Sequence, residues 1–230
     1  MDVEALLLTL RLATTTTLLL LLVAVPLSWW IARGTGLIRG LVQAVVALPL
    51  MLPPTVLGFY LLVLLGPRTE LGRLLIRVVG HPLAFSFSGL LIGSLLYSLP
   101  FAVQPLVAGF RSLEVGYVEA AEGLGVAPRK VFFGMVLPMA RASLLTGAVL
   151  TFTHTVGEFG VVLMLGGNIP GETRTLSISL YNMVEDGRYV AANQTAALLV
   201  GVAALTLLAI YLRRYRSQAG LGDSGSAILG

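Results

Sequence analysis

Two ionisable side chains four residues apart interrupt a long apolar run in the second half of the chain. His154 and Glu158 stand within residues 141–165, where most neighbouring side chains are apolar. Residues four apart share one face of a helix, so an imidazole and a carboxylate at this spacing can pair. Ionisable groups at membrane depth are costly and usually face a bundle interior or a wet cavity. Three interpretations stay open: a structural pair that fixes helix packing, residues that line a gate, and proton coupling as in a secondary transporter.

Glycines and prolines shape the apolar runs around this pair. Gly157 and Gly160 flank Glu158 and would allow another helix to approach closely. The second apolar run contains Pro53 and Pro54, so its helix must be kinked or locally unwound. Backbone groups freed inside a membrane need protein or water neighbours, and this helix is therefore expected to face the bundle interior. A proline kink without any role in transport is the alternative.

The chain offers no group of residues for catalysis. It has no cysteine, which excludes disulfides, thiolate metal sites and cysteine nucleophiles. Its two histidines are far apart in the sequence and do not make a zinc site. The GxxxxGK[ST] phosphate-binding loop is absent, so nucleotide hydrolysis by that route is excluded. We therefore expect a protein that is not an enzyme, holds no cofactor or metal and takes its energy from elsewhere.

The composition is that of a membrane protein. Hydrophobic residues make up 57% of the 230 residues, and the mean hydropathy is +0.92. The sequence pI of about 9.8 could suggest a nucleic-acid partner. However, the fifteen Lys and Arg residues are spread over loops between apolar runs and form no basic face. Membrane lipid is thus expected to surround the chain, and no nucleic acid is expected to bind it.

The apolar runs predict an all-α integral membrane protein with about five transmembrane helices. The predicted spans are residues 5–31, 41–65, 87–110, 141–165 and 194–212. They would form one transmembrane domain over residues 1–216, followed by a flexible cytoplasmic tail over residues 217–230. Between the second and third spans, residues 73–79 could lie as an amphipathic helix at the surface.

Positive charges orient the chain. Five spans put its two ends on opposite sides of the membrane. The loop after the first span, residues 111–141 and the residues after the last span together hold nine of the fifteen Lys and Arg residues. The positive-inside rule assigns this side to the cytoplasm, with the N-terminus outside and the C-terminus inside.

The charge-rich segment 111–138 separates the third and fourth spans. A first short helix is expected over residues 113–124, with Ser112 as its N-cap and Gly125 ending it in the left-handed conformation. A second short helix is expected to begin at Pro128 and to be closed by Pro138. Its first turn holds two cations that would face either lipid phosphates or a partner protein, Arg129 and Lys130.

This segment resembles the EAA loop of ABC-importer permeases. Glu119, Ala120 and Ala121 are followed by three residues, then Gly125, then nine residues and an apolar-x-Leu-Pro ending at residues 135–138. In that family the loop folds as coupling helices that insert into a groove on the cytoplasmic ATPase. The resemblance therefore implies a docking element made of Glu119, Ala120, Ala121 and Gly125, with Arg129 and Lys130 beside it. Met135 stands where the family often has Ile, a conservative departure.

Three further stretches are similar to the permease subunits of molybdate ABC importers. They are residues 48–54 (LPLMLPP), 157–160 (GEFG) and 168–175 (NIPGETRT). Sulfate and thiosulfate permeases share the prolines and the Gly-Glu-aromatic-Gly element, so the third stretch is the main reason to prefer molybdate. Relatives often have Arg where this chain has His154, so a charge role does not transfer to that position.

The resemblance implies the MetI-like fold of ABC-importer permeases and a bacterial inner-membrane location. It implies a homodimer that forms the pore, a cytoplasmic ABC ATPase dimer, an external oxyanion-binding protein and alternating access driven by ATP. The path would need hydrogen-bond donors that do not trap a dianion, and Thr151 and Thr155 or helix N-termini would suit it. Pro53, Pro54, Gly157, Glu158 and Gly160 complete the candidate pathway and gate. Tungstate is a plausible second cargo; the alternatives are a sulfate or thiosulfate permease and a self-contained secondary anion transporter.

Overall fold

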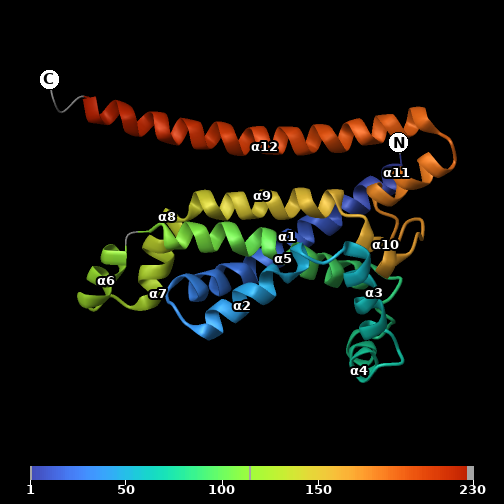
Figure 1. Ribbon diagram of the computed structural model, residues 1–230, viewed down its shortest axis with the longest axis horizontal. Coiled ribbons are helices and arrows are strands. Elements are labelled where there is room, and N and C mark those ends of the chain that lie inside the picture. The colour runs from blue at the N-terminus through green and yellow to red at the C-terminus, as the bar shows by residue number, and fades with distance from the viewer. Residues whose placement is uncertain (1, 114, 227–230) are drawn as a thin grey trace.

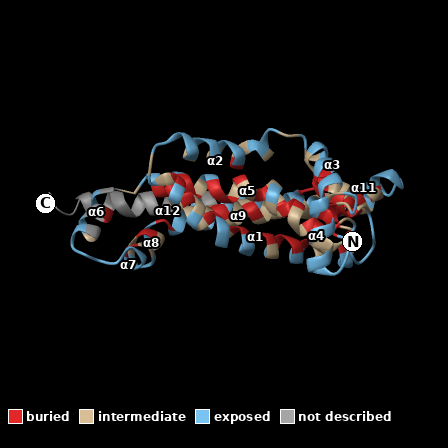
Figure 2. Ribbon diagram, turned by 90° about the horizontal axis from the view of Figure 1, so that it is seen from below, coloured by how far each residue is buried: buried red, intermediate tan, exposed pale blue. Residues whose placement is uncertain are grey.

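The computed structural model describes residues 2–113 and 115–226, and this part of the chain is built from helices and their connections. Three helices pack against one another as the central bundle: α1 (Val3–Ala32), α5 (Phe87–Arg111) and α9 (Arg141–Gly157). Side chains start two of them, because Asp2 accepts a hydrogen bond from the Ala5 backbone and Ser86 accepts one from the Gly89 backbone. Figure 2 shows that buried residues concentrate in these three helices.

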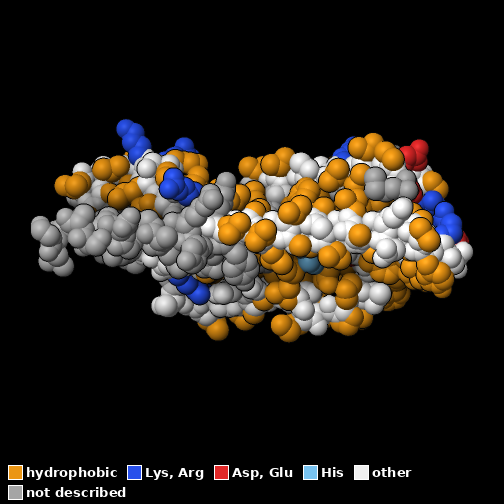
Figure 3. All heavy atoms as spheres, turned by 90° about the horizontal axis from the view of Figure 1, so that it is seen from above, with side chains coloured by type: hydrophobic (Ala, Val, Ile, Leu, Met, Phe, Trp, Pro, Cys, Tyr) orange, Lys and Arg blue, Asp and Glu red, His pale blue; other side chains and the backbone are white. Residues whose placement is uncertain are grey.

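The bundle core is aliphatic and tightly fitted. Leu12, Ala24 and Leu106 are fully buried in it. The Ser28 hydroxyl on α1 donates a hydrogen bond to the Val103 carbonyl on α5 over 3.2 Å, which satisfies a buried hydroxyl beside the two prolines of α5. Outward-facing positions are apolar too, and Figure 3 shows hydrophobic side chains along the side of the molecule with Lys and Arg toward its ends. This surface suits lipid.

Shorter helices fill the rest of the chain. The segment after α1 holds α2 (Leu37–Ala47), a 3-10 turn at Leu48–Leu50, α3 (Pro54–Leu65) and α4 (Glu70–Val79). The segment after α5 holds α6 (Val115–Gly123), α7 (Pro128–Val131), a π-helical turn at Phe132–Val136 and α8 (Leu137–Met139). After α9 come α10 (Gly160–Gly166), α11 (Leu176–Glu185) and α12 (Tyr189–Ser226).

Different short helices lie at the two ends of the bundle. In Figure 1, α6, α7 and α8 lie at one end, and α3, α4, α10 and α11 lie toward the end that carries the N-terminus. The long helix α12 runs along the bundle from the second end to the first. The segment 111–138 and the N-terminus therefore lie at opposite ends of the molecule.

The predicted spans are recovered, with two of them broken. α1 and α5 match the first and third spans to within two residues at each end. The second span is divided into α2 and α3, whose axes differ by 107°, and the fourth is divided into α9 and α10. By length and composition, three helices of the described part can cross a membrane, or up to five if two bent pairs each count as one span. These pairs are residues 37–50 with 54–65, and residues 128–139 with 141–157, which are bent by 69°. The prediction of an all-α membrane protein with about five spans is confirmed.

Two local predictions from the sequence are wrong, and most of the predicted tail lies within α12. Ser112 does not cap the next helix: it ends α5, where its hydroxyl donates to the Gly109 carbonyl over 2.8 Å, and the next helix begins at Val115. Pro138 does not close the second short helix, because the chain stays helical to Met139 and turns only at Ala140. α12 extends to Ser226 and so includes most of the predicted tail, whose flexibility stays a prediction; residues 227–230 lie outside the described part.

Candidate functional site

The two broken spans are interrupted at residues with extended backbone angles. In the second span, Pro53 has extended backbone angles (φ −56°, ψ 133°) and Pro54 begins α3. In the fourth span, Glu158 is extended (φ −69°, ψ 134°) between the end of α9 and the start of α10. The prolines predict the first break. The second break has only the glycines around Glu158 as its signal, and the sequence reading missed it.

The two breaks meet. α3 and α10 pack side by side, and a Cβ atom added to Gly160 would lie 2.6 Å from the Pro54 Cβ. Further along the pair, a Cβ on Gly58 would lie 2.7 Å from the Met164 Cβ. Close approach was predicted for Gly160 and is confirmed there. It is wrong for Gly157 within this chain, because a Cβ at that position would meet no atom within 4 Å.

Glu158 caps the half-helix that follows it. Its Oε1 accepts a hydrogen bond from the Val161 backbone N–H over 2.6 Å, and the Val162 N–H donates to both carboxylate oxygens at 3.3 and 3.2 Å. The side chain is 5% exposed, so these amides replace its hydration. The predicted pairing with His154 is wrong, because the helix ends at Gly157 and the four-residue spacing no longer places both groups on one face. The amides at the start of α10 are also used by Glu158 and are not free for an anion.

His154 points to α5 instead. Its Nδ1 lies 2.9 Å from the Ser98 hydroxyl, and its ring stacks on Phe101 with centroids 4.0 Å apart. The Ser98 hydroxyl also lies 3.0 Å from the Thr155 hydroxyl. Ser98 therefore joins two side chains of α9 to α5. The sequence reading did not single out Ser98, and a lone serine in an apolar helix gives no signal for this role.

The two threonines proposed for the pathway are buried in the bundle. Thr155 is 2% exposed and donates to the Thr151 carbonyl over 2.9 Å. Thr151 is fully buried, and its own hydroxyl has no hydrogen-bond partner. Within a single chain, neither hydroxyl faces an open passage. Their contact with cargo stays a prediction that requires the bundle to open.

The segment 111–138 is anchored by aromatic and aliphatic side chains. Phe132 packs against Trp29 at 5.7 Å and Phe110 at 6.4 Å between centroids, at the ends of α1 and α5. Val131 and Val136 are buried in the same cluster. The segment therefore packs directly against two bundle helices.

The opposite side of the segment is open. Gly125 has φ 75°, the left-handed conformation predicted for it, and ends the turn after α6. Ala121 is half-buried against the cluster, while Ala120 is exposed. The exposed surface also holds an aliphatic side chain and two cations: Leu124, Arg129 and Lys130. The side chain of Glu119 lies outside the described part.

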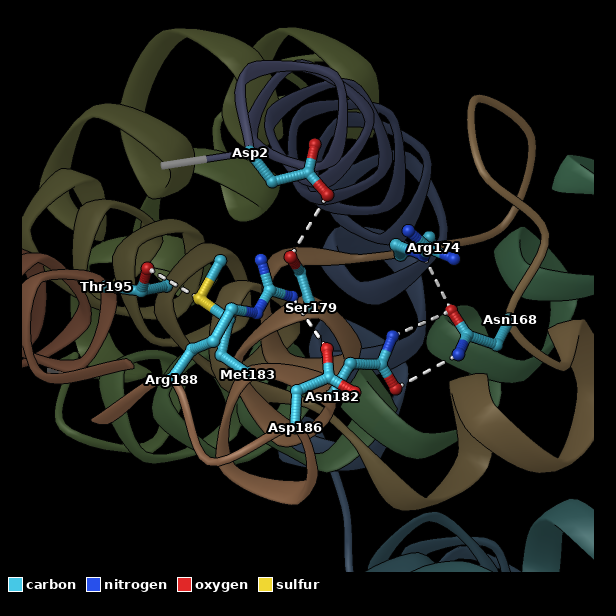
Figure 4. Close-up of polar contacts among 9 residues, drawn as sticks. All are labelled: Asp2, Asn168, Arg174, Ser179, Asn182, Met183, Asp186, Arg188 and Thr195. Atoms are coloured by element: carbon cyan, nitrogen blue, oxygen red, sulfur yellow. Dashed lines mark hydrogen bonds and ion pairs between the residues drawn. The ribbon is translucent and has the colours of Figure 1, made fainter. Parts of the chain in front are cut away.

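A polar network holds the connection between α10 and α12 (Figure 4). The Arg174 Nε donates to the Asn168 Oδ1 over 2.6 Å, and Asn168 exchanges hydrogen bonds with Asn182 on α11 at 3.0 and 3.1 Å. Asp2, at the start of α1, accepts a hydrogen bond from Ser179 over 3.0 Å. The NIPGETRT stretch is thus a fixed loop tied to α11, and α11 is tied to α1.

The described residues contain no group of three or more His, Cys, Asp or Glu side chains that could hold a metal ion. The candidate site is made of helix breaks and helix contacts instead. Two broken spans touch at Gly160 and Pro54, and a docked segment with an exposed outer surface lies at the other end of the bundle.

Comparison of the sequence with known proteins gives consistent matches. Residues 24–218 match the family described as binding-protein-dependent transport system inner membrane component. The molybdenum transport system permease protein ModB of Azotobacter vinelandii is 48% identical over 220 residues, which cover 96% of this chain and 97% of the relative. ModB of Escherichia coli K12 is 32% identical over 206 residues, covering 89% and 90%. A probable sulfate transport system permease protein of Chlorella vulgaris, cysT, is 30% identical over 208 residues, covering 90% and 78%.

Solved structures share the fold. The methionine ABC transporter MetNI, in inward-facing conformations, matches with a TM-score of 0.69 at 19% identity, covering 94% of this chain and 95% of that chain. A bacterial alginate ABC transporter in complex with a pentasaccharide-bound periplasmic protein matches with a TM-score of 0.73 at 18% identity, covering 90% and 76%. With the fold, the EAA spacing and the family match in agreement, this chain belongs to the family of binding-protein-dependent transport system inner membrane components.

Proposed function

We propose that this chain is the pore-forming permease subunit of an ATP-driven importer for molybdate, with tungstate as a second cargo. The observation that supports molybdate as the substrate is the similarity to ModB of Azotobacter vinelandii, which is 48% identical over 96% of this chain. The sulfate relative is only 30% identical. The chain would be a transport subunit and not an enzyme, because ATP hydrolysis belongs to a separate ATPase.

The proposed assembly contains two copies of this chain, two cytoplasmic ATPase subunits and an external oxyanion-binding protein. Support for the ATPase contact is the exposed surface around Gly125, which has the EAA spacing and combines an aliphatic side chain with two cations. This end would face the cytoplasm together with the end of α12, and the N-terminus would lie outside. Residues 1–216 would act as one domain.

Transport would proceed by alternating access. ATP-driven closure of the ATPase would displace α6 to α8, and the contact of Phe132 with Trp29 and Phe110 would pass the displacement to α1 and α5. At the other end, the contact of Gly160 with Pro54 would form or release with the gate. Glu158 would cap the first turn of α10 throughout this movement and would not contact the anion.

The substrate assignment is tested by competition. Labelled molybdate uptake is measured in vesicles that contain this chain, its ATPase and its binding protein. Tungstate should block uptake, and a large excess of sulfate should not. Equal competition by sulfate would assign the chain to the sulfate branch instead.

A further inference from the structure

Helix α4 stands apart from the central bundle. It follows α3 after four residues and is separated from the start of α5 at Phe87 by the connection 80–86. Figure 1 shows it beyond the far end of α3, on the half of the molecule that carries the N-terminus. In the orientation proposed above, α3 and α5 are parts of membrane spans, and these short connections would hold α4 at the level of the outer membrane surface.

Local interactions define both ends of this helix. The Thr69 hydroxyl accepts a hydrogen bond from the Gly72 backbone N–H over 3.0 Å and caps the first turn. Gly80, with φ 84°, ends the helix and donates to the Ile76 carbonyl over 2.8 Å. Gly72 packs so closely that an added Cβ would lie 2.0 Å from the Gly66 carbonyl oxygen. The orientation of α4 on the end of α3 is therefore fixed.

One stripe of α4 is apolar and open. Leu71, Leu74 and Val78 follow one another at helical spacing and are 41%, 56% and 76% exposed. Leu75, on the adjacent side, packs toward α3 and is half-buried. A soluble helix would turn its apolar stripe to the core, whereas α4 leaves this stripe outside.

A charged stripe borders the apolar one. Arg73 and Arg77 are exposed, and Arg73 forms an ion pair with Glu70. Together with Leu71 and Leu74, these three side chains line a shallow hollow on the surface of α4. Arginines beside an open apolar stripe can keep their charges at lipid phosphates while their stems lie along the acyl chains.

We propose that α4 is an interfacial helix that lies in the outer leaflet, with its apolar stripe among the acyl chains and Arg73 and Arg77 on phospholipid phosphates. The occupant is the bilayer surface, because α4 is held at membrane level and because cations border the stripe. α4 thereby fixes the outer end of α3, whose other end contacts Gly160 through Pro54. This inference rests on the proposed orientation of the chain, but not on which substrate the chain transports.

Labelling at one position tests the proposal directly. The chain has no cysteine, so Val78→Cys in the full-length protein takes a single fluorophore without background. Glu70→Cys is the matched control, because the Glu70 side chain is 91% exposed on the charged stripe. The proteins are placed in bilayer nanodiscs with phosphatidylglycerol. Quenching is measured with a lipid that carries a nitroxide near the top of its acyl chain and with aqueous iodide.

We expect the nitroxide lipid to quench the label at position 78 and iodide to quench it about threefold less than the label at position 70. Equal iodide quenching at both positions would overturn the proposal, because the stripe would then lie in water. Weak quenching of position 78 by both agents would also overturn it, since another protein surface would cover the stripe.

The arginines are tested on the same label. Arg77→Glu should reduce nitroxide quenching at position 78 in nanodiscs with phosphatidylglycerol by about twofold, because it places a carboxylate against anionic lipid. Arg68→Glu, in the connection before α4, is the control and should leave the quenching unchanged. The same loss from both variants, or from neither, would contradict the role given to Arg77.

Discussion

Gly160 and Pro54 mark the point where the two broken spans touch: an added Cβ on the glycine would lie 2.6 Å from the Cβ of the proline. Real Cβ atoms do not approach so closely, so an alanine at position 160 would force α3 and α10 apart. The proline ring is rigid, and rotation of a side chain cannot relieve the contact. α3 and α10 therefore move together unless the contact between Gly160 and Pro54 breaks.

Gly160→Ala should destabilise the protein by about 1–3 kcal/mol through this collision and should slow transport. Gly157→Ala, three residues earlier, is the control for thermal unfolding, because its added Cβ meets no atom within 4 Å. Thermal unfolding in detergent and uptake in vesicles measure the two effects. Equal behaviour of both variants would show that α3 and α10 do not pack as described.

Glu158→Ala should cost about 1–2 kcal/mol, because it removes the acceptor that caps α10. Glu158→Gln should cost less, since an amide oxygen in the place of Oε1 still accepts from the Val161 and Val162 N–H groups. Thermal unfolding of the two variants gives the comparison.

The same measurement tests whether Glu158 and His154 are independent. The structure gives them different partners, so the effects of Glu158→Gln and His154→Asn should add to within about 0.5 kcal/mol. Strong non-additivity would restore the pair that the four-residue spacing suggested.

Ser98→Ala should destabilise the bundle by about 1–3 kcal/mol, because the hydrogen-bonding groups of His154 and Thr155 lose a buried partner. Ser94→Ala is the matched control on the same helix. The Ser94 hydroxyl is buried without a hydrogen-bond partner, so its removal should be neutral or stabilising. A larger loss for Ser94→Ala than for Ser98→Ala in thermal unfolding would contradict the network.

Gly125→Ala should weaken binding of the ATPase to this chain. Its φ of 75° costs an alanine about 1–2 kcal/mol, although nothing within 4 Å obstructs a Cβ. Gly123→Ala, inside α6 and equally unobstructed, is the control and should be tolerated. The measurement is the amount of ATPase that co-purifies with the tagged permease. Undiminished co-purification with Gly125→Ala would remove this glycine from the proposed docking surface.

Much of the fold was predictable from the sequence because it depends on signals that are local in the chain. Apolar runs of membrane length predicted the spans, and the prolines at 53 and 54 predicted an interruption where α3 begins. Gly125 was correctly predicted to adopt the left-handed conformation because α6 must end there. None of these features depends on contacts between distant parts of the chain.

The remaining site depends on contacts between distant parts of the chain. The pairing of His154 with Glu158 was wrong because helical spacing holds only while the helix continues, and it stops at Gly157. Ser98 was missed because its partners are 56 and 57 residues away. The contact of Gly160 with Pro54 joins two spans, and the sequence pattern of neither span indicates it.

The most direct test of the account is uptake of labelled molybdate in vesicles, with the ATPase subunit present or omitted. We expect uptake to require both the ATPase and hydrolysable ATP, and we expect Gly125→Ala to lower it while Gly123→Ala does not. Uptake that continues without the ATPase would contradict the central claim, because the chain would then transport its cargo alone.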